Sequence, residues 1–392
     1  MSPVDSRQST VDGSGGRFLA ASAAILLTWI VAVLAWSYVA RDLPLFSERH
    51  LWSPETERRA PPLARYDSGW YAGIAEAGYG PAPARGEQSA HAFFPLYPMA
   101  VRGVRRLFSM DAFAAGQLVS LLCFFAAGLL FAAEGRKRLG EKGGREALLF
   151  LLLYPTAFFF AAMYSESLFL LLALLAFRSA RNGNAAAAVL FGFLAGSSRL
   201  PALAIAIPLA IETFQADRVR VPRRRAVLLG IAAGLAPVAG VLLWVLGAGW
   251  LAGEPGLYFR IQEGWHRGAS PLEGIRQFLV GLPARIARGD AREHPAFLLD
   301  YAHAALFAAI AVFQFQRRRF ADGAWTAGAL LIPASTGISA SLPRYVLVVY
   351  PAFFSLAEIF HDRPRLRLAW WIGSALLLAA CEAAFVRWHF VA

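Results

Sequence analysis

An acidic residue among aromatic side chains is the feature of this sequence that most suggests chemistry. Asp67 follows Tyr66 and precedes Trp70 and Tyr71, inside a polar stretch, residues 41–110, between two long apolar segments. A carboxylate that is partly desolvated at a membrane surface can have its pKa tuned for proton transfer. We therefore expect Asp67 to act as a general base toward an acceptor hydroxyl. The alternative is that Asp67 only caps the helix after it, because Asp is favoured at helix N-caps.

A second acid, Glu166, lies in a Tyr-Ser-Glu-Ser sequence between two strongly apolar runs. An ionisable residue in such a place is costly unless it lines a cavity or finds a partner. We expect Glu166 to position the donor or acceptor, or to serve as a second catalytic acid. The alternative is a polar turn in which Glu166 faces water.

Two isolated arginines, Arg199 and Arg344, occur beside prolines at the ends of apolar segments. The planar guanidinium group matches the oxygens of a phosphate, so we expect both to bind a phosphate group. The alternative is that they extend toward lipid headgroups. The side chains that we expect to contact substrate around these groups are Tyr66, Trp70, Tyr71, His91, Tyr164 and Tyr345.

The composition identifies the class of protein that positions these residues. The 392-residue chain is 57% hydrophobic and only 16% charged, whereas a soluble domain carries about 25% charged residues. The net charge of +12 comes largely from short loops between apolar segments, which argues against nucleic-acid binding. The sequence contains no Walker A, GxGxxG or HExxH motif and no Cys/His cluster, and Cys123 and Cys381 lie in apolar segments. We expect an all-α, polytopic membrane protein without a disulfide framework.

The apolar segments predict about eleven transmembrane helices, because about 20 apolar residues cross a bilayer. Residues 1–17 are expected to be a disordered cytoplasmic tail, and residues 18–392 a single transmembrane domain. The segments between 146 and 214 are the shortest, and some could be half-helices. The predicted spans are 18–40, 111–134, 146–163, 165–178, 185–199, 201–214, 226–250, 296–315, 323–341, 345–361 and 368–387.

Basic residues orient these spans. Every short loop on the N-terminal side of the membrane is basic, as the positive-inside rule requires of cytoplasmic loops. The two long loops, 41–110 and 251–295, then lie outside, and the candidate residues meet at the outer face together with His266. Trp265 in the second loop suits either a sugar-binding cap or an interfacial aromatic belt, and we favour the belt.

The first outer loop is expected to contain short helices. Residues 68–78 predict one, with Tyr71, Ile74 and Ala75 on one side and Gly78 as its end. Residues 91–99, followed by Arg102, Arg105 and Arg106, predict a segment that lies on the membrane with its arginines near headgroups. A Gly-xxx-Gly pattern at 192–196 predicts close helix packing.

Several blocks of residues occur in a familiar order along most of the chain. They are Arg65-Tyr66-Asp67-Ser68-Gly69-Trp70-Tyr71 with Gly78-Tyr79, Phe93-Phe94-Pro95-Leu96-Tyr97-Pro98 with Arg102, Tyr154-Pro155 and Tyr164-Ser165-Glu166-Ser167, Ser198-Arg199, and Pro343-Arg344-Tyr345. Together they resemble PIG-V-like mannosyltransferases, the family of the GPI mannosyltransferase that adds the second mannose, with its bacterial relatives. Tyr66 departs from the family pattern, which usually has Trp there, so the preferred sugar or acceptor could differ.

The resemblance implies a GT-C helix bundle and an inverting transferase. A hexose, typically mannose, would pass from a polyprenyl-phosphate sugar to a hydroxyl of a lipid-linked or cell-envelope glycan at the outer face of the plasma membrane. Asp67 would be the catalytic carboxylate, and Glu166, Arg199 and Arg344 would line the site with the arginines near the donor phosphate. No cofactor is implied, and a divalent metal near Asp67 is not required.

Two other functions stay open at this point. A transporter or flippase of a lipid-linked sugar would use the same arginines, but would favour pseudo-symmetric halves and polar residues at mid-membrane, and neither is clear in the sequence. A non-catalytic assembly subunit is the third possibility. The acceptor, the sugar and the oligomeric state are not given by the sequence.

Overall fold

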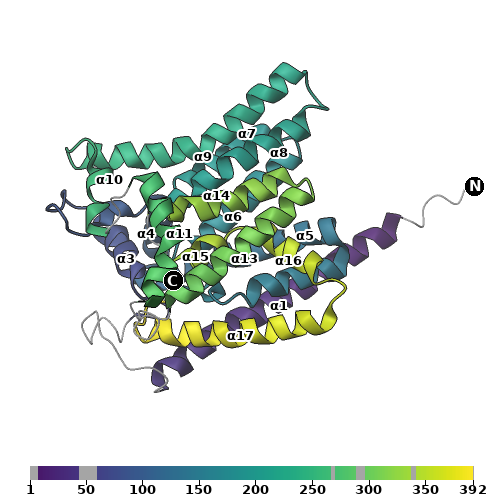
Figure 1. Cartoon of the computed structure of the whole chain (residues 1–392), viewed down its shortest axis with the longest axis horizontal. Helices are drawn as coiled ribbons and strands as arrows, with labels where there is room; N and C mark the ends of the chain where they lie inside the picture. The colour runs from purple at the N-terminus through teal and green to yellow at the C-terminus, as the bar shows by residue number, and fades with distance from the viewer. Residues whose placement is uncertain (1–7, 44–59, 266–269, 288–295, 337–340, 392) are drawn as a thin grey trace, which may run out of the picture.

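The described part of the molecule is helical throughout. The structure is a computed structural model, and it describes residues 8–43, 60–265, 270–287, 296–336 and 341–391. Long helices lie side by side in one bundle, while α3, α4, α10 and α15 gather at one end of it (Figure 1). These four short helices come from the two long predicted loops and from the segment around Arg344. The elements expected to carry the site therefore meet at a single end of the bundle.

Six helical segments among the described residues are long and apolar enough to cross a membrane. The chain is thus an all-α, multi-pass membrane protein, and the expected number of about eleven spans is not confirmed. Helix α1 (Gln8–Asp42) also begins inside the segment that we expected to be disordered. The six segments are Ser14–Asp42 of α1, Ala112–Leu152 (α5), Leu200–Asp217 (η3 and α8), Arg223–Leu251 (α9), Phe297–Gln316 of α13 and Pro364–Val386 (α17).

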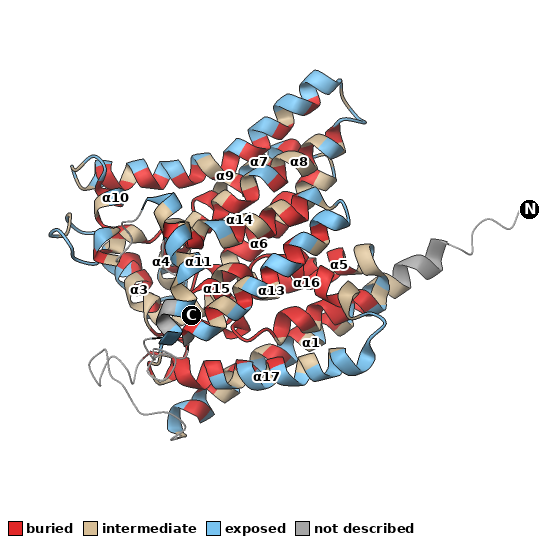
Figure 2. Ribbon diagram, viewed as in Figure 1, coloured by how far each residue is buried: buried red, intermediate tan, exposed pale blue. Residues whose placement is uncertain are grey.

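The remaining predicted spans correspond to shorter helices. They are α6 (Glu166–Arg181), α7 (Ala185–Gly196), α14 (Phe320–Ala334), α15 (Leu342–Leu347) and α16 (Tyr350–Ile359). Buried residues fill the centre of the bundle, and exposed ones follow the outer sides of α9 and α17 (Figure 2). Leu243 and Leu246 on α9 and Leu376 on α17 are among the exposed residues. Apolar side chains on an outer helix surface suit contact with lipid.

The predicted spans 111–134 and 146–163 meet in a tight turn. Helix α5 contains a residue with non-helical backbone angles, Gly140 (φ 74°, ψ 179°). Gly135 and Gly144 would be about 13 Å apart in a straight helix, from the rise of 1.5 Å per residue. A Cβ atom on Gly135 would instead lie 3.2 Å from the Cα atom of Gly144. The chain therefore reverses at Gly140, and α5 is a helical hairpin.

The second predicted span of this pair does not continue as a helix. After Leu152 the chain becomes irregular, apart from the short 3₁₀ helix η2 (Ala157–Phe160), and a regular helix resumes at Glu166. Almost every residue from Tyr154 to Ser167 is nevertheless buried. Irregular backbone at membrane depth is tolerated where protein surrounds it or where it lines a cavity. This buried segment carries Tyr164, Ser165 and Glu166 to the site.

The first long loop is organised as expected around α3 (Asp67–Ala77), which ends at Gly78 and buries Tyr71, Ile74 and Ala75. Helix α4 (Leu96–Phe108) follows the short helix η1 (Ala90–Ala92). Arg102 was expected near headgroups, but its Nε and Nη2 atoms donate hydrogen bonds to the carbonyl oxygens of Ala75 (2.8 Å) and Ile74 (2.7 Å). Arg102 thus stabilises the C-terminal end of α3.

Close helix packing at the Gly-xxx-Gly pattern is confirmed. A Cβ atom on Gly196 of α7 would lie 2.1 Å from the carbonyl oxygen of Pro237 on α9, which no side chain could tolerate. Cys123 and Cys381 are unpaired thiols, as the absence of a disulfide framework predicted.

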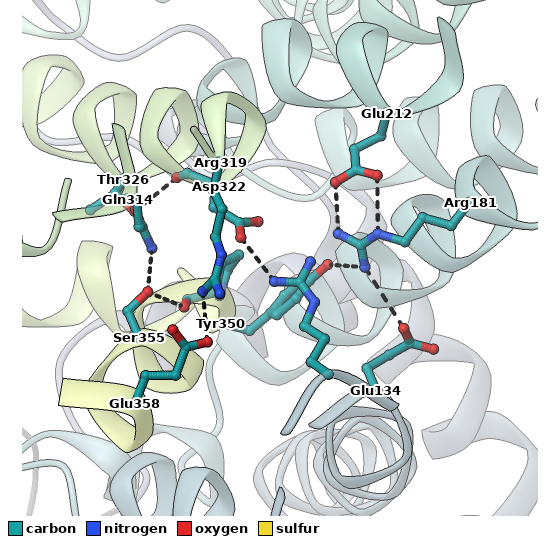
Figure 3. Close-up of polar contacts among 12 residues, drawn as sticks. Glu134, Arg181, Glu212, Gln314, Arg319, Asp322, Thr326, Tyr350, Ser355 and Glu358 are labelled. Atoms are coloured by element: carbon teal, nitrogen blue, oxygen red, sulfur yellow. Dashed lines mark hydrogen bonds and ion pairs between the residues drawn. The ribbon is translucent and has the colours of Figure 1, made fainter. Parts of the chain in front are cut away.

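Buried ion pairs fasten the bundle at the far end of α6 (Figure 3). Arg181, in the last turn of α6, contacts Glu212 at 3.0 Å, Glu134 at 3.8 Å and the hydroxyl of Tyr350 at 3.2 Å. Arg178 contacts the same Glu134 at 3.0 Å. Because α6 rises 1.5 Å per residue, this cluster lies about 22 Å from Glu166 at the other end of the helix.

Candidate active site

Asp67 is the first residue of α3, and it is not the N-cap. That position belongs to Tyr66, which has a positive φ (φ 50°, ψ −111°) and gives no side-chain cap. The ring of Tyr66 packs against Phe385, Trp388 and Phe390, with centroids 5.2–5.8 Å apart. A non-glycine residue with positive φ costs on the order of 1–3 kcal/mol, and it persists only where the surroundings hold it. The Asp67 carboxylate therefore does not take part in capping its own helix.

The carboxylate of Asp67 binds Arg344. The Nη1 atom of Arg344 donates a hydrogen bond to Oδ2 of Asp67 at 2.9 Å, across 277 positions of sequence. The two side chains are 22% and 12% exposed, so the pair is mostly removed from solvent. A hydrogen-bonded ion pair in such surroundings is far stronger than one at an open surface. The structure therefore joins two of the residues that the sequence suggested for chemistry.

Glu166 links Arg344 to the other candidate arginine. Its Oε1 atom lies 3.2 Å from Nε of Arg344 and 3.1 Å from Nη2 of Arg199. Glu166 is 1% exposed and Arg199 7% exposed. The alternatives of a glutamate in open water and of an arginine reaching to bulk lipid are therefore both wrong. Asp67, Arg344, Glu166 and Arg199 form one continuous chain of charges, here called the charge relay.

The surroundings of Arg344 keep it charged. Burial opposes the charged form, but the carboxylates of Asp67 and Glu166 outweigh that effect and hold the pKa of Arg344 well above its usual value. The guanidinium also lies over the rings of Tyr164 (5.2 Å) and Phe159 (5.5 Å). Such stacking favours a cation over an aromatic face. Arg344 is thus a permanently charged group at the centre of the charge relay.

Two tyrosines support the acids. The Tyr164 hydroxyl donates a hydrogen bond to the carbonyl of Arg65 (3.1 Å) and accepts one from the backbone N–H of Asp67 (3.3 Å). The Tyr71 hydroxyl donates to Oγ of Ser165 at 3.2 Å, next to Glu166. Burial raises the pKa of both phenols, so they keep their protons at neutral pH. Both phenols therefore remain neutral and keep donating to these protein oxygens beside the carboxylates.

The charge relay lies on the wall of a cavity of about 280 Å³. Tyr66, Tyr71, Tyr164 and Tyr345 are also on this wall, as we expected of substrate-contacting residues. Aromatic walls with few converging polar groups are typical of sites for sugars and other small ligands. The wall also contains residues that sequence reasoning did not select, namely Phe93, Phe94, Tyr258, Ile332, Pro333, Thr336 and Phe390.

Two expected residues are not on the cavity wall. His91 is fully buried beside it, where its Nδ1 atom shares a hydrogen bond of 2.9 Å with Ser89, and desolvation lowers its pKa. Trp70 stacks on Phe93 (5.9 Å) and so supports the wall from behind. Trp265 contacts Trp70 (6.2 Å) and lines the cavity, so it belongs to the site and not to the aromatic belt that we favoured. His266 lies outside the described residues.

The described residues contain no preformed cluster of metal-binding side chains. No group of three or more His, Cys, Asp or Glu side chains lies close enough there to hold an ion. Asp67 and Glu166 are the carboxylates on the cavity wall, and each is engaged by arginine. The chemistry that these side chains offer is proton acceptance by a carboxylate next to cationic groups that can stabilise an anion.

A protein-family model matches part of the chain. Residues 47–217 match a family model described as "Mannosyltransferase (PIG-V)". The matched range contains Asp67, Glu166 and Arg199 and ends before Arg344. No curated protein matches the chain.

One similar solved structure is the oligosaccharyltransferase of Archaeoglobus fulgidus in complex with Zn and sulfate. The TM-score is 0.42 and the sequence identity 13%, over 91% of this chain and 53% of that one. The chain thus spans about half the length of that protein.

Proposed function

We propose that the chain is a GT-C glycosyltransferase of the PIG-V mannosyltransferase family, whose model matches residues 47–217, and that it transfers mannose from a polyprenyl-phosphate sugar. The acceptor is a hydroxyl group of a lipid-linked or cell-envelope glycan. A lipid-linked donor suits this molecule because its described residues are helices of a multi-pass bundle and its cavity opens among them. The observation that carries the proposal is the pairing of Asp67 with a buried, charged Arg344 on the wall of that cavity.

The proposed reaction is a single displacement with inversion. The acceptor hydroxyl gives its proton to the Asp67 carboxylate, and its oxygen forms a bond to the anomeric carbon. The bond from that carbon to the phosphate oxygen breaks, and polyprenyl phosphate leaves with the electron pair. Arg344 and Arg199 stabilise the charge that develops on the phosphate. The ring of Tyr66 or Trp265 lies on the cavity wall, where it can stack on a sugar.

The orientation in the membrane belongs to the proposal. We place the N-terminus in the cytoplasm and the cavity at the outer face of the plasma membrane, because the short loops at the other end are basic. Helices α6, α7, α14 and α16 then lie within the bilayer beside the six longer segments. The sugar donor would enter the cavity from the outer leaflet.

The first test is transferase activity of purified protein with polyprenyl-phosphate mannose and a lipid extract from the source membrane. Asp67→Asn should lower the transfer rate by about 10²–10⁴-fold, the usual contribution of a general base. Asp111→Asn is the matched control, since Asp111 caps α5 through hydrogen bonds to Phe113 and Ala114 and Asn caps a helix equally well.

Each outcome has a definite meaning. Loss of transfer in Asp67→Asn, with unfolding temperatures equal to those of the control, supports Asp67 as the base. Undiminished transfer in that variant would show that Asp67 is not the general base. No transfer by the wild-type protein with any lipid-linked sugar would favour a transporter of such lipids instead.

A further inference from the structure

A single carboxylate oxygen holds both arginines of the charge relay. Oε1 of Glu166 lies 3.1 Å from Nη2 of Arg199 and 3.2 Å from Nε of Arg344. Nη1 of Arg344 donates a hydrogen bond to Asp67, whereas Nε makes an ion-pair contact with Glu166 without a hydrogen bond, so the two carboxylates contact different edges of the same guanidinium. Arg199 has Glu166 as its carboxylate partner among the described residues. Removal of Glu166 would therefore leave Arg344 anchored by Asp67 but Arg199 without a counter-charge.

Some polar atoms of this cluster have no partner within the described part of the chain. Oε2 of Glu166, Nη1 of Arg199 and Nε of Arg344 are buried and make no hydrogen bond there. Buried polar groups are normally satisfied, so each such atom needs an explanation, and a ligand is one. These atoms belong to residues on the cavity wall, so a bound substrate could supply the missing polar partners.

The charges on the cavity wall cancel. Two guanidiniums, of Arg199 and Arg344, face two carboxylates, of Asp67 and Glu166, and these are the charged residues that line the cavity in the described structure. Two arginines without that compensation would hold a phosphate monoester very tightly, since both signs of charge act strongly where water is excluded. Tight binding of the departing phosphate slows its release, and release limits the rate of many enzymes.

We propose that Glu166 is a positioning residue whose charge limits how tightly Arg199 and Arg344 hold the departing phosphate. The proposal rests on the transfer reaction proposed above. During transfer the proton moves to Asp67 and one negative charge moves to the phosphate, so Arg344 exchanges one anionic partner for the other. Glu166 keeps its charge throughout and holds Arg344 by its opposite edge. It thereby gives the product phosphate a competitor for both guanidiniums and takes no proton itself.

The test uses Glu166→Gln in the full-length protein in lipid nanodiscs. Glutamine keeps an oxygen acceptor for the two arginines and removes the charge. Polyprenyl phosphate without sugar should then bind at least about tenfold more tightly, because a nearby opposing charge has been removed. Transfer should show a burst of about one product per enzyme molecule, followed by a steady-state rate at least about tenfold slower than in wild type, since release becomes limiting.

Glu134→Gln is the matched control. Glu134 is also a buried carboxylate that two arginines share, Arg178 at 3.0 Å and Arg181 at 3.8 Å, but it lies at the far end of α6. That variant should lose thermal stability and keep the wild-type affinity for polyprenyl phosphate, without a burst. Glu166→Asp, which keeps the charge, should restore wild-type affinity for polyprenyl phosphate and serves as the test should the glutamine variant not fold.

Three results would overturn the assignment. Slow transfer by Glu166→Gln without a burst, at unchanged affinity for polyprenyl phosphate, would make Glu166 a participant in the chemistry. The same shifts in Glu134→Gln would make the effect a general one of lost ion pairs. A tightened affinity in Glu166→Asp would separate the effect from the charge. A wild-type protein that binds no polyprenyl phosphate and transfers no sugar would instead remove the proposed function itself.

Discussion

Tyr164 contacts both members of the Asp67–Arg344 ion pair. Its hydroxyl accepts a hydrogen bond from the N–H of Asp67, and its ring lies 5.2 Å beneath the guanidinium of Arg344. From one buried position, Tyr164 thus holds the backbone of Asp67 and the guanidinium plane of Arg344. The side chain touches neither carboxylate oxygen in these contacts. Its part is therefore to hold the geometry of the pair.

Tyr164→Phe should separate these contributions. The variant keeps the ring under Arg344 but removes the hydroxyl from Arg65 and Asp67, which should lower the free energy of unfolding by about 1 kcal/mol, the usual net value of a hydrogen bond. Transfer should fall by about tenfold or less, because a displaced base costs only part of its effect. Thermal unfolding measures the change in stability, and single-turnover transfer measures the change in rate. A loss as large as that of Asp67→Asn would instead make the hydroxyl part of the reaction.

The sequence could suggest these residues but not their pairing. Asp67, Glu166 and Arg344 stand out because ionisable residues are rare next to apolar segments, and the charge of the loops assigns them to one face. That Arg344 has both carboxylates as partners depends on side-chain geometry across 277 positions, which no local pattern records. Residues such as Ile332 and Phe390 could not be selected, since an apolar side chain on a cavity wall looks like any core residue.

At the scale of elements, α3 is held at both ends. Its first residue, Asp67, is tied to Arg344, and its last turn is tied through Ile74 and Ala75 to Arg102 of α4. Cationic groups stabilise a helix C-terminus by satisfying its unpaired carbonyls and by opposing the dipole. The position of the proposed base therefore depends on a contact about 12 Å away along the helix, at 1.5 Å per residue.

Arg102→Ala should loosen α3. We expect a loss of about 1–3 kcal/mol in stability, since two charge-assisted hydrogen bonds disappear, together with a lower transfer rate. Arg106→Ala is the control, because Arg106 is exposed on the same helix. Hydrogen exchange of the backbone amides of residues 67–77 reports the loosening directly. Equal exchange in the two variants would contradict this role of Arg102.

Hydropathy alone misjudged one element for a physical reason. The segment 153–163 was expected to complete the predicted span 146–163, because an apolar run looks the same whether it faces lipid or protein. The structure shows it irregular and buried among neighbouring helices. Helix α3, by contrast, was predicted almost to the residue, since its polar start and its terminal Gly78 are local signals.

At the scale of the whole molecule, the two ends of the bundle differ in kind. One end carries the cavity and the short helices of the long loops, and the other carries ion pairs such as Arg181–Glu212 and Arg319–Glu358 (Figure 3). These partly buried ion pairs connect neighbouring helices to one another. The proposed orientation puts this fastening on the cytoplasmic side.

Cysteine labelling tests the orientation. Gln88→Cys and Val219→Cys place thiols at exposed positions, in the first long loop and after α8, in a background without Cys123 and Cys381. A membrane-impermeant maleimide applied to intact cells or spheroplasts should label position 88 alone, and both positions after permeabilisation. Labelling of position 219 alone in intact cells would place the cavity in the cytoplasm.

The long sequence separation between Asp67 and Arg344 also determines when the site can assemble during synthesis. The ion pair spans 277 residues, and Arg65, next to the acid, binds the carbonyl of Val386 across 321. At about 5–20 residues per second, a ribosome makes Arg344 roughly 15–55 s after Asp67. During that interval Asp67 has been synthesised but Arg344 has not, and α17 has also not yet been made. With the roles proposed for Asp67 and Arg344, we expect transfer activity to begin only after α17 has joined the other helices, so synthesis itself would delay activity until the bundle is whole.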